Sequence, residues 1–584
     1  MIDMLFYDFE CFRYDWLAVL IDPKEPVPYV VINNVDLLKK IYDEHKNDIW
    51  IGFNSRHYDQ YILKALLCGF DAWEVNDYII NKGLPGWQFS SLLRDIFLIN
   101  YDVAPLNNSL KQLEGFQGHS IHESSVDFTI DRKLTQEEIN ETVQYCINDV
   151  QETMNVFAEK VADFQVQLEL IKEFDLPLSM MGKTQTQLTA EILQAEKHDY
   201  GDDFDLTLQP YLSHIKKYRK VVDWYKSFIT KEKLTREEKD KIYTQSLDII
   251  IAGVPHTFGW GGAHGAIPKY SGRGYYLHID VHQYYPSLVV SNNYFPRGTS
   301  EEGKRRYEMM KNESVRLKAF PELKNKRAGY KMCNNKMTGG MKDASNKLYD
   351  AKNNNNICVG GQLAILLLIE MLEPHVNLIQ SNTDGIIVKL PDLKTYDIVD
   401  DICYEWEQMT GVGLGFDQII VRIYQKDVNS YLYVDADGNV ERKGGYVKEL
   451  SPMDNDLPVI NKALVEYMLN GTPPEKTINE CNSMIDFQKI CKLTNKYDYV
   501  VAGGKKYTNK CYRIYASKRK SDGTIYKVKH QTGGKSQYCK FGNTSDISFI
   551  ENGDVTEMKV PEYLDKEWYI ELAYKRLKQY GAEV

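Results

Sequence analysis

No two cysteines in this chain are spaced as a metal-binding pair. The ten cysteines are scattered, none forms Cys-x-x-Cys, and no Cys/His cluster has zinc or iron–sulfur spacing. This pattern predicts free thiols in a reducing compartment. It argues against a disulfide-linked secreted domain and against a cysteine-bound metal module.

Long hydrophobic runs are missing as well. The longest, Leu363–Leu372, is interrupted by Glu370 and is too short to span a bilayer, so it predicts a buried helix. The N-terminal residues MIDMLFYDFE are acidic where a signal peptide carries positive charge. We therefore expect a cytoplasmic protein with no membrane partner.

An excess of positive charge is also absent, because 71 Lys and Arg against 82 Asp and Glu give a net charge of −11. This argues against a surface that grips a phosphate backbone throughout, but it leaves room for a local basic track. Residues 492–530 contain eleven Lys and Arg against two Asp, with tyrosines interleaved. Such a mixture suits contact with a nucleic-acid backbone and stacking on bases; a solvated β-sheet face is the alternative.

What is present has the length and texture of several domains. The 584 residues are 43% hydrophobic and 26% charged, which is typical of a soluble globular chain. Residues 1–165 alternate predicted strands, such as Met4–Tyr7 and Ile49–Phe53, with helices. A helix over Leu134–Lys160 is expected to open with a capping box formed by Thr135 and Glu138.

The texture changes further along the chain. Residues 166–250 predict a mostly helical connector. From about residue 251, short apolar strands at Tyr275–Val281 and Val376–Ser381 are separated by long helical stretches. The polar run Asn353–Asn356 predicts a short loop, and a helix is expected near Leu457–Leu469.

Four acidic residues of the first 165 residues form one candidate site. Asp8 and Glu10 follow an apolar strand at i and i+2, so both carboxylates point to the same face. Asp59 lies in the loop after the second strand, and Asp149 lies on the predicted helix one turn after Tyr145. Such acids can converge on two divalent metal ions that activate a water against a phosphodiester. Tyr145 would orient that water.

Together these residues resemble the three exonuclease motifs of the DEDD class, tyrosine variety, that proofread in DNA polymerases. The resemblance implies a ribonuclease-H-like 3′→5′ exonuclease domain over residues 1–165. The residues that it implies as metal ligands are Asp8, Glu10, Asp59 and Asp149. The residues that it implies as contacts to single-stranded DNA are Asn54, Tyr58, Ser109 and Leu110.

A second candidate site combines two acids that are far apart in sequence. Asp280 ends the apolar strand Tyr275–Val281. Asp384 lies at the tip of a predicted hairpin with a tight turn, between Val376–Ser381 and Ile386–Lys389. Between them, a predicted helix over Ala328–Gly339 carries Lys331 on one face, where it could bind phosphate.

These segments resemble motifs of the palm and fingers of family-B DNA polymerases, most of all small bacteriophage enzymes. Residues 280–287, D-V-H-Q-Y-Y-P-S, are similar to motif A; residues 331–339 are similar to motif B; and residues 382–384, N-T-D, are similar to motif C. Asn382 replaces the first acid of motif C, Thr338 replaces the aromatic residue of motif B, and Asn429 replaces the lysine of the family's K-x-Y motif.

The resemblance implies roles for individual residues. Two Mg²⁺ ions per active site, with Mn²⁺ as an alternative, would be held by Asp280, Asp384 and the Val281 carbonyl. Tyr285 would exclude a ribose 2′-hydroxyl. The residues implied as contacts to the dNTP are Tyr284, Tyr285, Arg327, Lys331 and Asn335. The residues implied as contacts to primer-template DNA are Gly261, Gly262, Thr383, Tyr431 and Lys443.

The expected architecture is therefore an α/β and α+β multidomain protein, an exonuclease domain followed by a right-hand polymerase. After the connector, the palm would occupy residues 251–299 and 341–450, the fingers hairpin 300–340, and a thumb or DNA-binding region 451–584. Only 43 residues separate Ser287 from Lys331, enough for two helices. We therefore expect extension of an ordinary nucleic-acid 3′-hydroxyl rather than priming on a protein.

The leading interpretation is a monomeric phage DNA polymerase with proofreading, acting in the cytoplasm of a bacterial host with a helicase, a primase or a single-strand-binding protein as possible partners. Two alternatives stay open. One is a nuclease whose polymerase half only holds DNA, and the other is a catalytically dead replisome-binding protein on the same scaffold. The six acids at the two sites argue against the second alternative.

Overall fold

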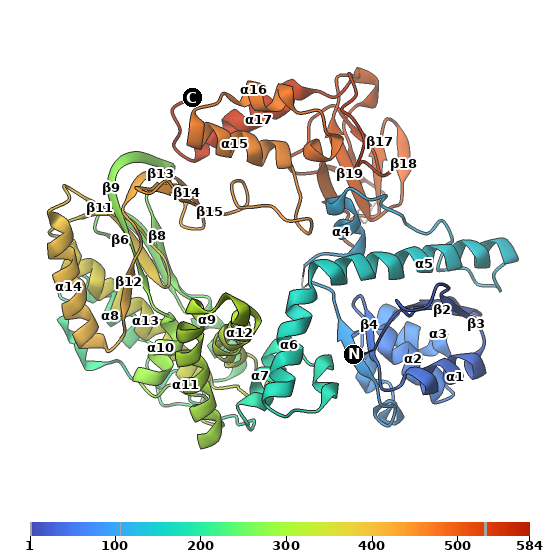
Figure 1. Ribbon diagram of the computed structural model, residues 1–584, viewed down its shortest axis with the longest axis horizontal. Helices are drawn as coiled ribbons and strands as arrows, with labels where there is room; N and C mark the ends of the chain where they lie inside the picture. The colour runs from blue at the N-terminus through green and yellow to red at the C-terminus, as the bar shows by residue number, and fades with distance from the viewer. Residues whose placement is uncertain (1–2, 106, 531–533) are drawn as a thin grey trace. The chain divides into compact units, whose positions relative to one another are not determined.

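The computed structural model describes residues 3–105, 107–530 and 534–584 (Figure 1). The chain forms two compact units, each built from three segments. Unit 1 contains Met1–Lys183, Leu450–Ile460 and Ile478–Tyr569, and unit 2 contains Thr184–Glu449, Asn461–Thr477 and Ile570–Val584. Both units mix helices and strands, so the protein is a mixed α/β multidomain protein. The predicted boundary at residue 165 falls inside helix α6 (Val161–Glu173), and the predicted region 451–584 is shared by both units.

The N-terminal part of unit 1 is a five-stranded sheet of order β3-β2-β1-β4-β5. Strand β1 pairs antiparallel with β2 and parallel with β4, which in turn pairs parallel with β5. One face of β1 presents Leu5, Tyr7 and Phe9 to an apolar core. The other face lies under helix α5, where Phe6 contacts Phe157 with ring centroids 5.4 Å apart. The strands are β1 (Met4–Cys11), β2 (Trp16–Ile21), β3 (Tyr29–Ile32), β4 (Ile49–Gly52) and β5 (Ile99–Asp102).

Helix α5 (Gln136–Glu159) begins at the predicted capping box of Thr135 and Glu138, which is confirmed. Two smaller sheets complete unit 1, with orders β16-β19-β22 and β18-β17-β20-β21. The fully buried Arg513 of β19 joins them to the N-terminal part, because its guanidinium donates to the carbonyls of Gly115 at 3.2 Å and His119 at 2.6 Å. The strands are β16 (Lys489–Lys492), β17 (Tyr499–Ala502), β18 (Lys505–Tyr507), β19 (Cys511–Ala516), β20 (Tyr526–His530), β21 (Ser536–Lys540) and β22 (Ser548–Ile550).

Unit 2 is built on a 10-stranded sheet in which β9 pairs with β11, β13 and β12. The predicted strands around Asp280 and Asp384 are confirmed, because they form β9, β10 and β11. The strands are β6 (Ser246–Ile251), β7 (Val254–Gly259), β8 (Ala263–Ala266), β9 (Tyr270–Val281), β10 (Asn377–Ser381), β11 (Gly385–Leu390), β12 (Leu414–Phe416), β13 (Ile420–Asp427), β14 (Ser430–Asp435) and β15 (Val440–Lys443).

The remaining helices lie around these sheets (Figure 1). Those of unit 1 are α1 (Val35–His45), α2 (Asp59–Leu67), α3 (Ala72–Asn76) and α4 (Leu110–Gln117). Those of unit 2 are α7 (Gln185–Ile192), α8 (Arg219–Lys226), α9 (Arg236–Tyr243), α10 (Tyr284–Ser291), α11 (Glu301–Arg316), α12 (Lys324–Gly340), α13 (Ala351–Leu372) and α14 (Thr395–Thr410). Three C-terminal helices follow: α15 (Pro458–Asn470), which confirms the predicted helix, α16 (Pro474–Glu480) and α17 (Lys566–Gln579).

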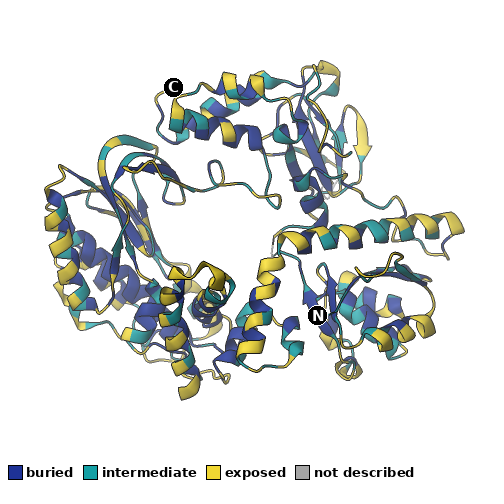
Figure 2. Cartoon of the chain, viewed as in Figure 1, coloured by how far each residue is buried: buried dark blue, intermediate teal, exposed yellow. Residues whose placement is uncertain are grey.

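Helix α13 corrects one prediction, because Asn353–Asn356 is not a loop but the buried first turns of this helix. Asparagines are tolerated there because their side chains are satisfied by tertiary hydrogen bonds. The amide of Asn355 donates to the Asp203 carbonyl at 2.9 Å, and the Asn356 oxygen accepts from the Thr207 amide at 2.9 Å. Of the described helices, α13 alone is long and apolar enough to cross a membrane, but 83% of its apolar window is buried inside the protein (Figure 2).

Candidate active sites

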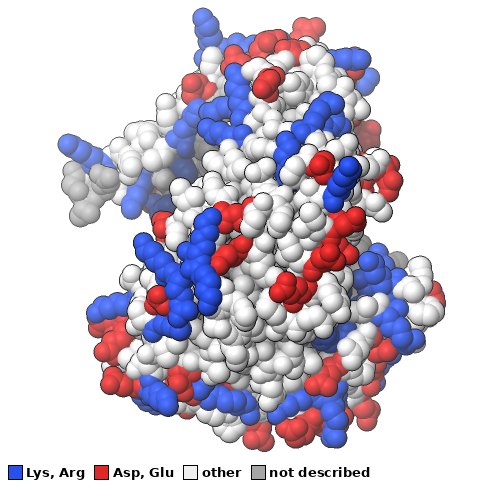
Figure 3. All heavy atoms as spheres, turned by 90° about the vertical axis from the view of Figure 1, so that its left-hand side faces the viewer, with Lys and Arg blue, Asp and Glu red and all other residues white. Residues whose placement is uncertain are grey.

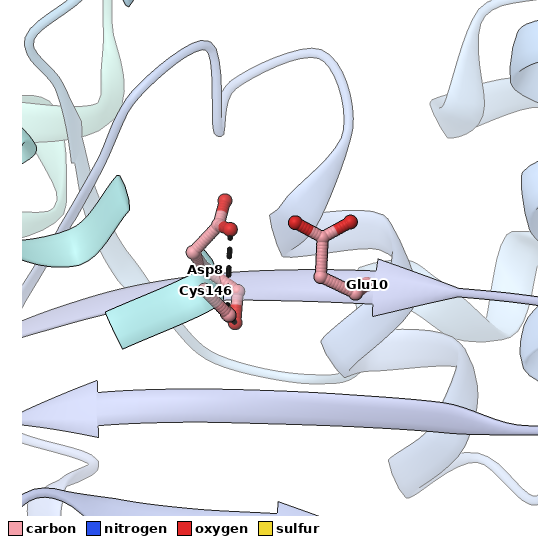
Figure 4. A group of neighbouring side chains, drawn as sticks. All are labelled: Asp8, Glu10 and Cys146. Atoms are coloured by element: carbon pink, nitrogen blue, oxygen red, sulfur yellow. Dashed lines mark hydrogen bonds between the residues drawn. The ribbon is translucent and has the colours of Figure 1, made fainter. Parts of the chain in front are cut away.

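The first acid cluster lies in unit 1 between β1 and α5. Asp8 and Glu10 project from the same side of β1, as predicted (Figure 4). The Cys146 thiol of α5 donates to Oδ2 of Asp8 at 3.4 Å. One ligand-type atom from each of these three residues lies within 4.8 Å of the others.

Asp59 joins this cluster from the first residue of α2. Its Oδ1 accepts a hydrogen bond of 3.1 Å from the amide of Phe9, the residue between Asp8 and Glu10. Burial raises the pKa of Asp8 to about 7, and repulsion from Asp149 is the second largest cause of this rise. Burial, followed by repulsion from Asp8, also raises the pKa values of Glu10 and Asp59. The acids therefore share one desolvated site that favours a cation.

Tyr145 and Asp149 complete the predicted set from α5. Burial raises the pKa of Tyr145, and Asp149, to which the phenol is hydrogen-bonded, raises it further. Lys111 of α4 forms an ion pair with Asp149 and a second one, at 2.8 Å, with Glu114. Its ammonium also lies 4.8 Å from the centre of the Tyr145 ring.

Lys111 and Glu114 are two further charged residues of this site that were not predicted from the sequence. Glu114 is 1% exposed, and burial raises its pKa to about 7. The sequence feature that could have indicated them is a Lys–Glu pair at i and i+3 on a short helix that also carries the apolar residues Leu110, Leu113 and Phe116, all of which are buried. Charged residues on the buried side of an apolar helix are seldom placed there unless they are paired.

Other predicted residues of this region have separate positions. Tyr58 and Glu10 line a cavity of about 650 Å³ together with Arg13, Trp73 and Phe128. Asn54 has a left-handed backbone, and its amide donates to Asp102 at 2.9 Å. Ser109 is the N-cap of α4, and Leu110 is the first residue of this helix and is buried. Among the described residues that line the cavity, Asn54, Ser109 and Leu110 do not occur.

The second site is a cavity of about 290 Å³ in unit 2. It collects residues from β9, α10, α12 and the β10–β11 turn, which are distant in sequence. The residues lining it are Asp280, Val281, Gln283, Tyr284, Tyr285, Pro286, Lys331, Asn334, Asn335, Thr383 and Asp384.

Backbone pairing brings the two acids of this cavity together. The Val281 amide donates to the Asp384 carbonyl at 2.8 Å, and Gly385 lies opposite Asp280 in the β9–β11 register. A Cβ at Gly385 would lie 2.8 Å from the Ile279 carbonyl oxygen, so glycine permits this close approach. Burial, followed by repulsion from Asp384, raises the pKa of Asp280 to about 6. Two acids in one desolvated cavity again favour a cation.

The two tyrosines that follow β9 differ in their surroundings. Tyr284 is 4% exposed, and its hydroxyl donates to the Gly361 carbonyl of α13. Tyr285 stacks on Tyr284 with ring centroids 5.9 Å apart, and burial raises the pKa of its phenol. Both tyrosines line the cavity, but Tyr284 is in addition anchored to α13 through its hydroxyl.

Helix α12 brings Lys331, Asn334 and Asn335 to the cavity, of which Asn334 was not predicted. Asn334 is 1% exposed, and neither polar atom of its side-chain amide has a hydrogen-bond partner among the described residues. Arg327 is not among the described residues that line the cavity; its Nε donates instead to the Ser314 carbonyl of α11 at 3.1 Å.

The residues predicted to contact primer-template DNA are only partly gathered. Thr383 lines the cavity, and a Cβ at Gly262 would lie 3.0 Å from its hydroxyl, so the glycine backbone adjoins the turn that carries Asp384. Tyr431 and Lys443 are cross-strand partners on β14 and β15, with the ammonium 5.9 Å from the ring centre. Gly261 has no described heavy atom within 4 Å of a Cβ built there.

Both clusters have a donor set that suits Mg²⁺, which prefers carboxylate and carbonyl oxygens. In unit 2 these oxygens would come from Asp280, Asp384 and Val281. In unit 1 they would come from Asp8, Glu10, Asp59 and Asp149. The Cys146 thiol is a poor ligand for such an ion, and burial raises its pKa, so it stays protonated as a donor to Asp8.

Comparisons with known proteins give little beyond the fold. No family model matches the chain, and no curated protein matches it. One similar solved structure is the family B DNA polymerase from the hyperthermophilic archaeon Pyrobaculum calidifontis. It is 12% identical, the alignment covers 100% of this chain and 78% of that chain, and the TM-score is 0.41. At that identity and score the likeness assigns no activity, which has to be argued from the side chains.

Proposed function

We propose that this protein is a template-directed DNA polymerase with a 3′→5′ exonuclease. The observation that carries the proposal is the cavity of unit 2, in which two acids, a lysine and a tyrosine converge from four separate segments. Nucleotidyl transfer needs this combination, because a triphosphate has to be bound beside two metal-binding carboxylates.

Each residue of the cavity has a role in that reaction. Bound Mg²⁺ ions would lower the pKa of the primer 3′-hydroxyl and neutralise the triphosphate. Asp280, Asp384 and the Val281 carbonyl would hold these ions. Lys331, which is exposed on α12, binds the phosphates as a point charge. Tyr285 supports the deoxyribose and leaves no room for a 2′-hydroxyl.

The acid cluster of unit 1 is proposed as the exonuclease site. Asp8, Glu10, Asp59 and Asp149 would hold its metal ions, and Tyr145 would orient the attacking water. The cavity beside Glu10 is lined by Trp73 and Phe128, whose rings suit a terminal base. Lys111 lies close enough to Asp149 and Tyr145 to fix both side chains.

We further propose that the enzyme is of the small bacteriophage family-B type, which its motif sequences support. Its substrates would be dNTPs and primer-template DNA, and single-stranded DNA would enter the exonuclease site. It would act in the cytoplasm of a bacterial host, with phage helicase, primase or single-strand-binding protein as partners.

A second candidate is a nuclease whose polymerase half only holds DNA. The observation that favours it is Asn382, which replaces an acid in the resembled motif. Its side-chain oxygen accepts from the Thr383 amide at 2.8 Å, so it caps the turn instead of offering a carboxylate. Asp280 and Asp384 are both present in the cavity, however, and their carboxylates would be available to hold metal ions.

Primer extension with and without dNTPs distinguishes these functions. A polymerase with proofreading lengthens a labelled primer when dNTPs are present and shortens it when they are absent. Asp280→Asn should abolish lengthening and spare shortening, and Asp8→Ala should do the reverse. Shortening without lengthening in the unaltered protein would favour the nuclease. The absence of both activities would refute both proposals.

A further inference from the structure

The four-stranded sheet β18-β17-β20-β21 of unit 1 has one face that packs on an apolar core and one face that does not. Val500, Ala502 and Phe541 belong to the core cluster. Lys527, on the same side as Val500, covers it with its ammonium 5.3 Å from the Phe541 ring centre. The opposite face has the fully buried Val528 at its centre, so a ligand can reach only the side chains that surround Val528.

The strand register places three tyrosines on that opposite face. Residues directly across an antiparallel pair share a face. One row contains Lys506, Val501, Tyr526 and Lys540, and the next contains Tyr499, Val528 and Tyr538. We call this set the tyrosine face. Tyr499 and Tyr538 lie two strands apart, or roughly 10 Å at the usual strand spacing.

Tyr538 is the exposed ring of the tyrosine face, whereas Tyr499 and Tyr526 are half-buried beside basic side chains. Tyr538 is 55% exposed, and its ring meets that of Tyr526 edge-on at 5.9 Å. The ammonium of Lys506 lies 4.4 Å from the Tyr499 ring centre. Lys540 pairs with Asp546, an exposed partner that a phosphate can replace at little cost. Figure 2 shows part of this sheet as exposed.

The charge of the tyrosine face indicates which kind of ligand it would bind. The chain as a whole is acidic at −11, and both signs of charge occur across the face drawn in Figure 3. Of the eleven basic residues in segment 492–530, Arg513 is fully buried and Lys527 lies on the core side, so the positive charge of the two rows comes from Lys506 and Lys540 on the tyrosine face. A polyanion is therefore attracted to the tyrosine face. A protein or membrane partner would have to present acidic groups together with flat rings that stack on the tyrosines.

We propose that the tyrosine face binds single-stranded DNA, with bases stacked on the tyrosines and phosphates held by Lys506 and Lys540. Stacking requires bases that are free of a partner strand, so duplex DNA should bind poorly. The sheet belongs to the same compact unit as the first acid cluster, so the bound single-stranded DNA and the proposed exonuclease site would lie in one structural unit. The proposal does not depend on polymerase activity.

Site-specific photocrosslinking tests the proposal on the full-length protein. A 12-nucleotide oligo(dT) carrying 5-iododeoxyuridine is irradiated with the protein in EDTA, and the crosslinked peptides are identified by mass spectrometry. We expect crosslinks at Tyr538 and Tyr499 that saturate with oligonucleotide. Crosslinks confined to other segments would overturn the proposal, as would equal competition by a duplex of the same length.

Variants show whether stacking is the cause. Tyr526→Ala should raise the oligonucleotide concentration needed for half-maximal crosslinking at Tyr538 by about 5- to 150-fold, and Tyr526→Phe should keep the original value. Lys506→Gln should reduce the slope of log affinity against log salt by about 0.7. Tyr404→Ala is the matched control, because Tyr404 is 63% exposed on α14 of the other unit. Unchanged saturation in both Tyr526→Ala and Lys506→Gln would refute the site.

Discussion

Asn334 offers a sharp test of the proposed nucleotide site, because it is buried with two unpaired polar atoms beside the acids. A buried polar group without a partner lowers stability, and a ligand that supplies the partner recovers that loss. We predict that Asn334→Leu weakens nucleotide use without lowering the free energy of unfolding. These opposite expectations separate a ligand-binding residue from a structural one.

The magnitude follows from two hydrogen bonds. Each contributes about 0.5–1.5 kcal/mol net, so losing both costs about 1–3 kcal/mol of binding to the nucleotide. At 1.4 kcal/mol per factor of ten, kcat/KM for dNTP insertion should fall by about 5- to 150-fold. The assay is steady-state insertion of a single nucleotide, combined with a urea titration of unfolding.

Asn353 of α13 provides the matched control, since it is also a buried asparagine but its amide donates to the Phe295 carbonyl at 2.7 Å. Asn353→Leu should lower the free energy of unfolding by about 1–3 kcal/mol, because it leaves that carbonyl unpaired. The kcat/KM of the folded fraction should be retained. If Asn334→Leu left kcat/KM within twofold of the original value, or destabilised the protein as much as the control does, the reasoning would be refuted.

Further outcomes follow from the two sites and the core. Tyr285→Val should raise ribonucleotide incorporation by roughly 10- to 200-fold relative to dNTP use. Tyr284→Val should instead lower the free energy of unfolding by roughly 2–5 kcal/mol, because Tyr284 is buried and bonded to α13; the reverse result would show that the gate is the other tyrosine. Chelation with EDTA should stop both extension and degradation while circular dichroism stays unchanged, and Mg²⁺ should restore both; activity that persists in EDTA would contradict the metal sites. Arg297→Met should cost about 3–5 kcal/mol of stability, because Arg297 neutralises Asp350, which is 1% exposed. Arg305→Met should cost less than about 1 kcal/mol, because the Arg305 side chain is 73% exposed in its pair with Glu302; losses equal to those of Arg297→Met would argue against the buried pair.

Local patterns in the sequence predicted the elements that carry the acids. A D-x-E pair after an apolar strand, Tyr and Asp one turn apart on a helix, and an acid at a tight turn are all set by backbone periodicity. The structure accordingly gives β1, α5 and the β10–β11 turn where these patterns predicted them. That Asp280 and Asp384 meet was inferred from the family resemblance, and the β9–β11 register supplies the contact itself.

Predictions from local composition were wrong where tertiary contacts determine the position of a residue. Asn353–Asn356 has the polarity of a loop, but it lies inside α13 because residues near 203–207, about 150 positions away, supply hydrogen-bond partners. Arg327 shares a helix with Lys331 but donates to the Ser314 carbonyl, because α11 packs beside it. Neither outcome could be read from a window of neighbouring residues.

The sequence by itself determined which neighbouring residues share one face of a strand or helix, because strand alternation and helix spacing depend only on the local chain. Tertiary structure alone decided which distant groups became neighbours. It placed Lys111 against Asp149, left Asn334 without a partner beside the acids, and joined Arg513 to carbonyls almost 400 residues away. These contacts depend on how elements pack, and packing is selected by the burial of the whole core rather than by any local pattern.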